Sequence, residues 1–294
     1  MGASISTMPE LHEAVGVRIY SLGSRLQDYF TALYCFSVEA ADGVEVVDCH
    51  YPDWAAVHFL AEGEPHRVSL WGETPKERAP FTANGPTSRA LSVRLRSSQF
   101  WSLGLNPVGW SRYAESPASG VANTIVDGQD HAAFARLAPI LEIVRENPGD
   151  PDGTARQIED FLCTARSTRS PHEVQVIALH EALRDPAIGD VEGLVDRVGV
   201  SRRTLERLAS RYFGFSPKLL LRRQRFLRSL GKYTRSSDSN WSTSLDGHYV
   251  DQAHFVRDFR AFMGMTPSEY VQMPHPLLES IFTPRLAEQG AHQG

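Results

Sequence analysis

The 294-residue sequence has few cysteines and no long apolar run. Its three cysteines, Cys35, Cys49 and Cys163, are widely spaced, which excludes a disulfide framework and is typical of a reducing compartment. No apolar run reaches the roughly twenty residues that a membrane-spanning helix requires. The first fifteen residues do not show the basic and then apolar pattern of a secretory signal. We therefore expect a cytoplasmic protein that does not associate with membranes.

The sequence also lacks the motifs of common enzyme classes. It contains no glycine-rich phosphate loop, no Gly-x-Ser-x-Gly elbow and no Cys-x-x-Cys pair. Cys49 and His50, with His58, are the one group that could gather around a metal. Adjacent residues of a strand point to opposite faces, so only one of the first two could enter a barrel. We expect no catalytic site, no metal and no cofactor.

Short segments rich in β-branched and aromatic residues fill residues 8 to about 112. Turn signals such as Asp-Gly, Pro-Asp and Asn-Gly-Pro separate them. Strands are expected at residues 15–20, 29–38, 44–50, 55–60, 66–71 and 90–95. Short strands at this spacing predict a small β-barrel or sandwich. Its aromatic residues would form either ordinary core or the lining of a small-molecule cavity; they are Tyr29, Phe30, Tyr34, Phe36, Trp54, Phe59 and Trp71.

From Asp130 onwards the apolar residues recur with a helical period. A first helix is expected to end near Asn147, and a second helix covers residues 155–165. These two helices would form either a dimerisation surface or a layer packed on the barrel. Residues 166–171 are small and polar and end in a proline, so they are expected to be a linker.

Two similar helical units lie in the last third of the chain. Ser201 and Asp251 are suitable N-caps, and each is followed by a helical pattern of buried positions. Gly214 and Gly264 would end these helices, and a Ser-Pro or Thr-Pro pair then starts the next helix. Gly199, two residues before the first cap, fits the tight turn of a helix-turn-helix.

Positive charge is concentrated around the first unit, although the whole chain has a net charge of −5. Residues 171–273 hold 15 Lys and Arg against 12 Asp and Glu, a net charge of +3. Within residues 197–235 there are 12 basic residues and a single acidic one, Glu206. A basic stripe of this kind favours binding to nucleic-acid phosphates.

The ordered run "vSrRtLeRl…yfGfSPk…rrqRf…DQaHFvRdFraf.GmtPseY" resembles the DNA-binding domain of AraC/XylS-type transcription regulators over about residues 171–273. The pieces "PDwaavhFLaeG", "NGPtsRal" and "GLNPvGW" also resemble the N-terminal domain of one branch of these bacterial regulators. Trp54 replaces the glycine expected after Pro52-Asp53, and Ser88 intrudes before Arg89. The second resemblance implies a fold and no chemistry.

The first resemblance implies roles for particular residues. One recognition helix begins at Ser201 and a second at Asp251, and a connecting helix over residues 216–230 places both on one face of the duplex. Each recognition helix would then enter one of two successive major grooves. The expected DNA-binding residues are Arg202, Arg203, Glu206, Arg207, Gln252, Val256 and Arg257. Arg222, Arg225 and His254 are expected to contact phosphates. For each arginine, a role limited to phosphate or solvent contact is the alternative.

The second unit departs from the pattern of these regulators. Ser244 stands where a small alanine usually packs, and His248 stands at the turn glycine. A non-glycine residue with positive φ costs about 1–2 kcal/mol, so we expect either Gly247 or His248 to adopt that conformation. Residues 233–240 are also weak helix formers. The second unit would then be less stable and read DNA less strictly.

The sequence predicts an α+β protein. An N-terminal β-barrel or sandwich carries a helical subdomain, and an all-α C-terminal domain carries two helix-turn-helix units joined by a linker helix. The expected boundaries are 8–127 for the sensor, 128–165 for the helical subdomain, 166–171 for the linker, 172–273 for the DNA-binding domain and 274–294 for a tail without an assigned role.

The predicted function is that of a transcription regulator that binds double-stranded DNA. RNA polymerase, a small-molecule effector and a second copy of the chain are further expected partners. The alternative is a ligand-binding barrel protein whose degenerate second helix-turn-helix gives only weak, non-specific DNA binding.

Overall fold

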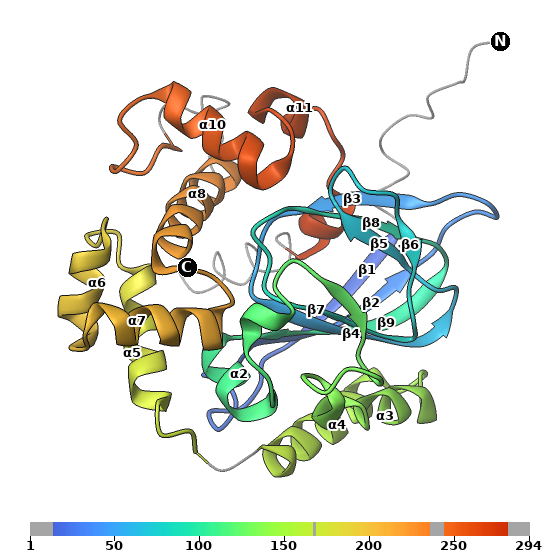
Figure 1. Cartoon of the computed structure of the whole chain (residues 1–294). Coiled ribbons are helices and arrows are strands. Elements are labelled where there is room, and N and C mark those ends of the chain that lie inside the picture. The colour runs from blue at the N-terminus through green and yellow to red at the C-terminus, as the bar shows by residue number, and fades with distance from the viewer. Residues whose placement is uncertain (1–13, 167–168, 236–243, 282–294) are drawn as a thin grey trace, which may run out of the picture.

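The computed structural model describes residues 14–166, 169–235 and 244–281. The N-terminal half contains two antiparallel sheets that face each other (Figure 1). The larger sheet has the strand order β1-β2-β9-β4-β7-β10, and the smaller has the order β3-β8-β5-β6. The strands are β1 Val15–Tyr20, β2 Phe30–Val38, β3 Val46–His50, β4 Ala55–Gly63, β5 Arg67–Leu70, β6 Lys76–Glu77, β7 Phe81–Asn84, β8 Leu91–Leu95, β9 Ser98–Leu105 and β10 Ile125–Asp127.

The six expected strands are present, and the bounds of the first agree with the prediction. The sequence interpretation missed β6, β7, β9 and β10. Among these, β9 is the most important, because it pairs with β2 on one side and β4 on the other.

The large sheet is covered on both faces. On the outer face, Trp101 and Leu103 of β9 are buried in a core that also includes α3 (Ile140–Glu146) and α4 (Pro151–Ala165). Figure 1 shows these two helices lying beneath the sheet. The first of them is shorter than expected, because residues 135–137 form a separate 3₁₀ turn before it. The inner face of the sheet turns toward the smaller sheet and the cavity described below.

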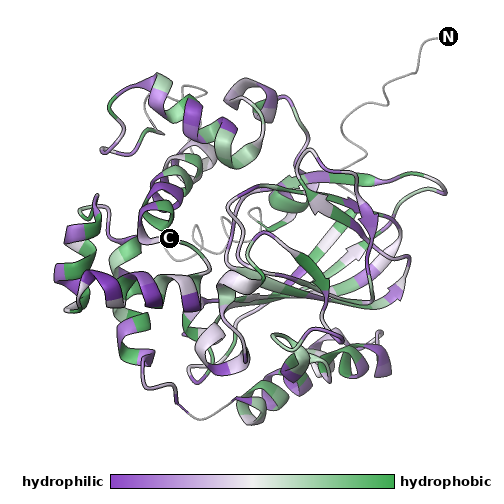
Figure 2. Ribbon diagram, in the orientation of Figure 1, coloured by the Kyte–Doolittle hydropathy of each residue, from purple (hydrophilic) through white to green (hydrophobic). Residues whose placement is uncertain are grey.

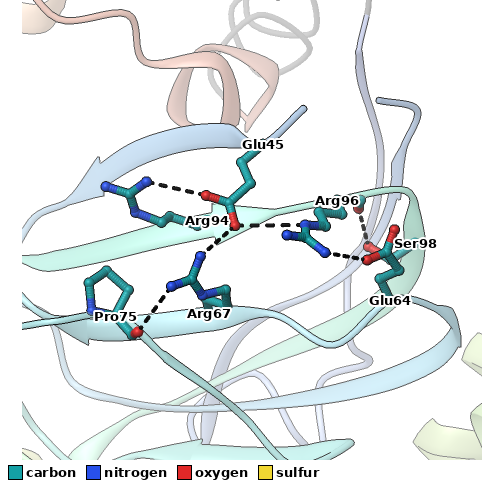
Figure 3. Close-up of polar contacts among 7 residues, drawn as sticks. All are labelled: Glu45, Glu64, Arg67, Pro75, Arg94, Arg96 and Ser98. Atoms are coloured by element: carbon teal, nitrogen blue, oxygen red, sulfur yellow. Dashed lines mark hydrogen bonds and ion pairs between the residues drawn. The ribbon is translucent and has the colours of Figure 1, made fainter. Parts of the chain in front are cut away.

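The smaller sheet has a polar outer face (Figure 3). Glu45, just before β3, accepts hydrogen bonds from Arg67 (3.0 Å) and Arg94 (3.2 Å) and lies 3.7 Å from Arg96. Burial acts to raise the pKa of Glu45, but the bonds from Arg67 and Arg94 lower it overall. The carboxylate is therefore ionised at neutral pH and fixes the orientation of this sheet, with its apolar side turned inward.

The C-terminal part of the chain is helical and packs against the barrel. Helix α2 (Pro107–Tyr113) follows β9 and contacts α5 and the turn after α7. One continuous apolar core extends from the barrel through α2 into the first helical unit. Figure 2 shows strong hydrophilic colouring along α7, on the outside of this packing. The C-terminal helices are α5 Glu173–Arg184, α6 Val191–Val198, α7 Arg202–Leu208, α8 Pro217–Arg235, α10 Gln252–Met263 and α11 Pro267–Val271.

Helix α8 is longer than predicted. It contains 19 residues, which corresponds to about 28 Å at 1.5 Å per residue, whereas residues 216–230 were expected. The weak helix expected over residues 233–240 falls mostly on residues 236–243, which lie outside the described part of the chain. No helix in the described ranges is long and apolar enough to cross a membrane.

Candidate nucleic-acid interface and barrel cavity

The first helical unit has the local structure that its sequence predicts. Ser201 caps α7 by accepting a hydrogen bond from the Thr204 amide (3.3 Å). Gly199 has φ 70° and Gly214 has φ 84°, so both adopt the left-handed conformation that favours glycine. Between α7 and Gly214, residues 209–213 form a π-helical turn. The unit therefore starts and stops at the predicted residues.

The second unit repeats this arrangement. The Asp251 carboxylate accepts a hydrogen bond from the His254 amide (2.6 Å) and caps α10. Gly264 ends the helix with φ 71°. Thr266 then starts α11 with a reciprocal capping box to Glu269. The buried face consists of Phe255, Phe259 and Phe262, as predicted.

The turn of the second unit corrects one prediction. Neither Gly247 nor His248 has a positive φ; within the described ranges, Asn123 is the one non-glycine residue that does. The His248 ring instead bonds to the Pro186 carbonyl (2.9 Å), and its amide donates to Asp246 (3.1 Å). The expected backbone strain is absent, because this turn is formed without a left-handed residue at either position. Ser244 is buried, at the position where the small residue was expected.

The predicted groove-facing residues of the first unit lie on the outer side of α7. Arg203, Glu206 and Arg207 are exposed, while Leu205 and Leu208 are buried. Arg202 is also exposed, but its guanidinium donates to Glu192 of α6 (2.6 Å) and lies 3.7 Å from Glu206.

Two arginines of α7 are available for an outside partner. Within the part of the chain that the structure describes, no ion pair engages Arg203 or Arg207, in contrast to Arg202. Their guanidinium groups are therefore free to contact a groove.

The corresponding residues of α10 are placed in a similar way. Gln252 and Arg257 are exposed, and Val256 is half-buried beside them. His254 is half-buried and its ring lies edge-on to that of Tyr249, with 5.1 Å between the ring centroids.

A buried carboxylate fastens the second unit to the connecting helix. Asp258 of α10 is 1% exposed and accepts hydrogen bonds from Arg222 (2.6 Å) and from the Tyr249 hydroxyl (3.0 Å). Arg225 lies 3.7 Å from the same carboxylate. Arg222 and Arg225, both expected to contact phosphates, therefore have an intramolecular partner. Sequence reasoning missed Asp258, because an acidic residue in a basic helical region resembles a solvent-exposed one.

A third arginine of the connecting helix reaches the barrel. Arg223 is fully buried, and its Nη1 donates to the carbonyls of Asp53 (3.1 Å) and Thr87 (2.8 Å). Its guanidinium lies over the Trp54 ring, 3.8 Å from the centroid. Burial lowers the pKa of Arg223 to about 10, so it remains charged at neutral pH. Arg223 thus joins α8 directly to the barrel rim.

A cavity of about 150 Å³ lies between the two sheets. Across the large sheet, one row of facing residues consists of Tyr34, Ser102, His58 and Thr82. Asn84, at the end of the next row, donates from its amide nitrogen to His58 Nε2 (3.1 Å). Phe36 and Phe100 stack beside these rows, and Leu91, Val93 and Leu95 of β8 form the opposite wall.

Three of the seven aromatic residues considered for this cavity line it: Tyr34, Phe36 and Trp54. Phe30 and Phe59 belong to the core on the other side of the sheet, and Tyr29 packs against that core. Trp71 packs against the second helical unit. His50 lines the cavity, while Cys49 is buried in the opposite direction, as alternation along β3 predicts. No cluster of three metal-ligating side chains occurs in the described ranges.

The two capped units and the helix that joins them define a double helix-turn-helix protein. Residues 194–273 match the family model described as "Helix-turn-helix domain". The matched part of the chain is therefore similar to known helix-turn-helix domains. It is 30% identical over 102 residues to the HTH-type transcriptional regulator GbdR of Pseudomonas aeruginosa. That match covers 35% of this chain, and the chain spans 28% of the length of the relative.

Solved structures of two proteins resemble larger parts of the chain. The unsaturated fatty acid-bound form of ToxT from Vibrio cholerae has a TM-score of 0.41 and is 11% identical, with 88% of this chain and 95% of that chain covered. The AraC-like transcriptional activator CuxR has a TM-score of 0.25 and is 17% identical, with 74% and 88% covered.

We predict that Asp258→Ala destabilises the protein by about 3–5 kcal/mol, because it leaves two arginine side chains without their buried partner. Denaturant unfolding of the full chain would measure this change. Asp196→Ala, at an exposed position of α6, is the control and should change the free energy of unfolding by less than about 0.5 kcal/mol. Similar values for the two variants would contradict the structural role of Asp258.

We also predict that His58 makes the protein less stable in acid. Burial lowers the pKa of His58 to about 3, whereas its ordinary value is 6.5. Between these two values the unfolded chain binds a proton that the folded chain does not. Stability is then lost as the pH falls, by at most about 1.4 kcal/mol per pH unit. In unfolding measurements between pH 6.5 and 4.5, His58→Gln should show a smaller slope than the wild type. An unchanged slope would show that His58 titrates normally.

Proposed function

We propose that this protein is a sequence-specific transcription regulator whose two helix-turn-helix units read two successive major grooves. The observation that carries this proposal is the repetition of one architecture. Each unit presents a capped helix with exposed polar and basic residues, and one continuous helix, α8, holds the two together. A helix of this kind fits the width of the major groove of B-DNA.

The side chains on the two helices suit different bases. Arg203 and Arg207 can each donate two hydrogen bonds to guanine O6 and N7, and Glu206 can accept from cytosine N4. On α10, Gln252 suits adenine, Val256 suits the thymine methyl group, and Arg257 suits guanine. We assign Arg202 a supporting role, because Glu192 already holds its guanidinium.

The geometry of α8 also suggests a bent operator. The helix is about 28 Å long, whereas successive major grooves on one face are about 34 Å apart. A rigid spacer shorter than the groove repeat favours DNA that bends toward the protein. The capture of Arg222 and Arg225 by Asp258 makes this spacer rigid at its junction with the second unit.

We further propose that the N-terminal domain controls DNA binding by taking a small effector into the barrel cavity. The cavity has an aromatic and apolar wall with a few polar groups, as is common in small-molecule sites. The segment between β3 and β4 connects the cavity to the DNA-binding part, because Asp53 and Trp54 line the cavity and also contact Arg223 of α8. An effector would act by shifting the populations of two arrangements.

Dimerisation through α3 and α4 is the second candidate for the regulatory role. Ile140, Leu141 and Val144 of α3, and Ile158 and Leu162 of α4, are already buried in the core under the sheet. A dimer interface would therefore have to use the polar faces of these helices. This favours the effector over dimerisation as the means of control.

We predict that Arg203→Ala and Arg257→Ala each weaken binding to the specific site by about 1–3 kcal/mol and relax base preference at one position. The full chain would be titrated with DNA from upstream of its own gene and with random duplex, across a salt series. Arg156→Ala, at an exposed position of α4, is the control and should leave both affinities unchanged.

DNA binding by the Arg203→Ala and Arg257→Ala variants distinguishes the possible roles of the two units. If Arg203→Ala alone reduces specificity, the second unit only anchors the protein on the DNA. If the wild type binds the upstream DNA no more tightly than random duplex, the proposal of a sequence-specific regulator is wrong.

A further inference from the structure

The barrel cavity contains an unsatisfied polar group. Asn84 is 5% exposed, and its Oδ1 has no hydrogen-bond partner among the residues that the structure describes. In this orientation the amide nitrogen donates to His58 Nε2 (3.1 Å), and Oδ1 is the group left without a partner in the described part of the chain. A buried acceptor without a partner costs about 1–3 kcal/mol. A ligand that donates a hydrogen bond to Oδ1 would recover this free energy.

Among the residues that the structure describes, no Lys or Arg lines the cavity. Its basic groups are histidines, and burial lowers the pKa of His58 to about 3 and that of His66 to about 4. The one acidic side chain in the lining is Asp53, at the rim. A carboxylate in this space would lack a direct counter-charge, because the Arg223 guanidinium lies over the Trp54 ring and does not itself line the cavity, and leaving water is then unfavourable.

The size of the cavity limits the ligand further. A volume of about 150 Å³ is that of a cavity that accommodates benzene in another protein. Phe36, Phe100 and Trp54 provide flat apolar surfaces around this space. The space therefore fits one ring or a short branched chain, and it is too small for a long lipid chain.

One wall of the cavity comes from the C-terminal end of the described chain. Residues 276–281 form a short helix beyond α11, and its Leu277, Leu278 and Ile281 line the cavity. Leu277 is 7% exposed and packs in the same cluster as Phe36 and Phe100. The tail was expected to have no role, but these three of its residues line the cavity.

Asp48 of β3 holds this wall in place. Its carboxylate is 1% exposed and accepts hydrogen bonds from the amides of Leu277 (2.9 Å) and Leu278 (3.2 Å). It also bonds to His275 Nδ1 (3.1 Å). Burial acts to lower the pKa of His275, but the bonds to Asp48 and to the Tyr270 carbonyl raise it overall. The segment that lines the cavity is thereby bound to a barrel strand at its first turn.

We propose that the barrel cavity binds a small uncharged molecule that carries a hydroxyl group, with Asn84 as its hydrogen-bond acceptor and residues 275–281 as a wall held by Asp48. The inference rests on the proposed effector role and specifies the ligand for it. Because the wall follows α11 directly along the chain, a ligand in the cavity contacts both the barrel and the segment that continues from the DNA-binding part. Binding at the two sites is then thermodynamically linked.

The ligand class can be tested on the full chain with four probes: phenol, benzyl alcohol, toluene and benzoate. Calorimetry at pH 7.5 should show that phenol and benzyl alcohol bind about tenfold more tightly than toluene, because only they satisfy Asn84. Benzoate should bind more weakly than benzyl alcohol. In Asn84→Leu, which conserves the size of the side chain, phenol and toluene should bind equally. Asn106→Leu, outside the cavity, is the control and should keep the wild-type preference.

Three outcomes would overturn the proposed ligand class: benzoate binding more tightly than benzyl alcohol, an unchanged preference for phenol in Asn84→Leu, or no binding of any probe. The DNA titration of the preceding section is independent of these probes. Failure of the ligand proposal and failure of the regulator proposal are therefore distinguishable.

If Asp48 holds residues 275–281 against the cavity, Asp48→Asn should give a different result from Asn84→Leu. Releasing residues 275–281 should weaken phenol and toluene binding alike, by at least about fivefold, and leave the preference for phenol intact, because Asn84 is unchanged. Hydrogen exchange of the Leu277 and Leu278 amides should become at least about tenfold faster, while the amides of β9 keep their protection. Asp42→Asn, at an exposed position before β3, is the control.

In the wild type, saturating phenol should slow exchange of the Leu277 and Leu278 amides. If phenol leaves these amides unaffected, or if Asp48→Asn binds both probes as the wild type does, the C-terminal segment is not part of the site. If Asp48→Asn lost β9 protection, Leu278→Ala in the full chain would replace it, and the same loss of affinity for both probes is expected because Leu278 lines the cavity.

Discussion

Arg223 is the contact on which the arrangement of the two halves depends. An isolated guanidinium in the interior of a protein is costly, because its charge and its N–H groups lose their water. Here the carbonyls of Asp53 and Thr87 and the face of Trp54 replace part of that hydration. Nε and Nη2 still lack partners within the described ranges. A buried guanidinium needs hydrogen-bond acceptors close by, and few other positions of α8 against the barrel would provide them. Arg223 therefore fixes the position of α8.

The other arginines of α8 show how one basic helix serves several purposes. Arg222 and Arg225 point toward Asp258, and Arg228 donates to Asp246 (2.6 Å). These bonds hold the second helix-turn-helix unit, whose turn lacks the usual glycine. The unit keeps its geometry through buried ion pairs and the packing of three phenylalanines, and without a strained backbone. Helix α10 needs such support, because only its buried face packs against the rest of the protein.

The sequence predicted some strands and helices better than others, for a physical reason. Caps and glycine stops are local signals, so the start of α7 and both ends of α10 were placed correctly, while Gly214 ends the π-helical turn that follows α7. Strand β9 was missed although Trp101, Leu103 and Leu105 alternate with Ser102 and Gly104, because glycine is disfavoured in strands and weakens the signal of the segment. Small residues line the cavity at these two positions because it needs space. The feature that hid the strand from the sequence interpretation is therefore part of the candidate site.

The sequence by itself determined the double helix-turn-helix pattern, the caps that start its helices and the basic stripe that accompanies it. These depend on neighbours within a few residues, where spacing and residue type are sufficient. The tertiary structure alone decided which charges face outward and which are internal partners, as Arg203 and Arg223 illustrate. It also decided that Asp48 binds a segment some 230 residues later. Such contacts depend on how distant parts of the chain fold back on each other, and no local pattern encodes that.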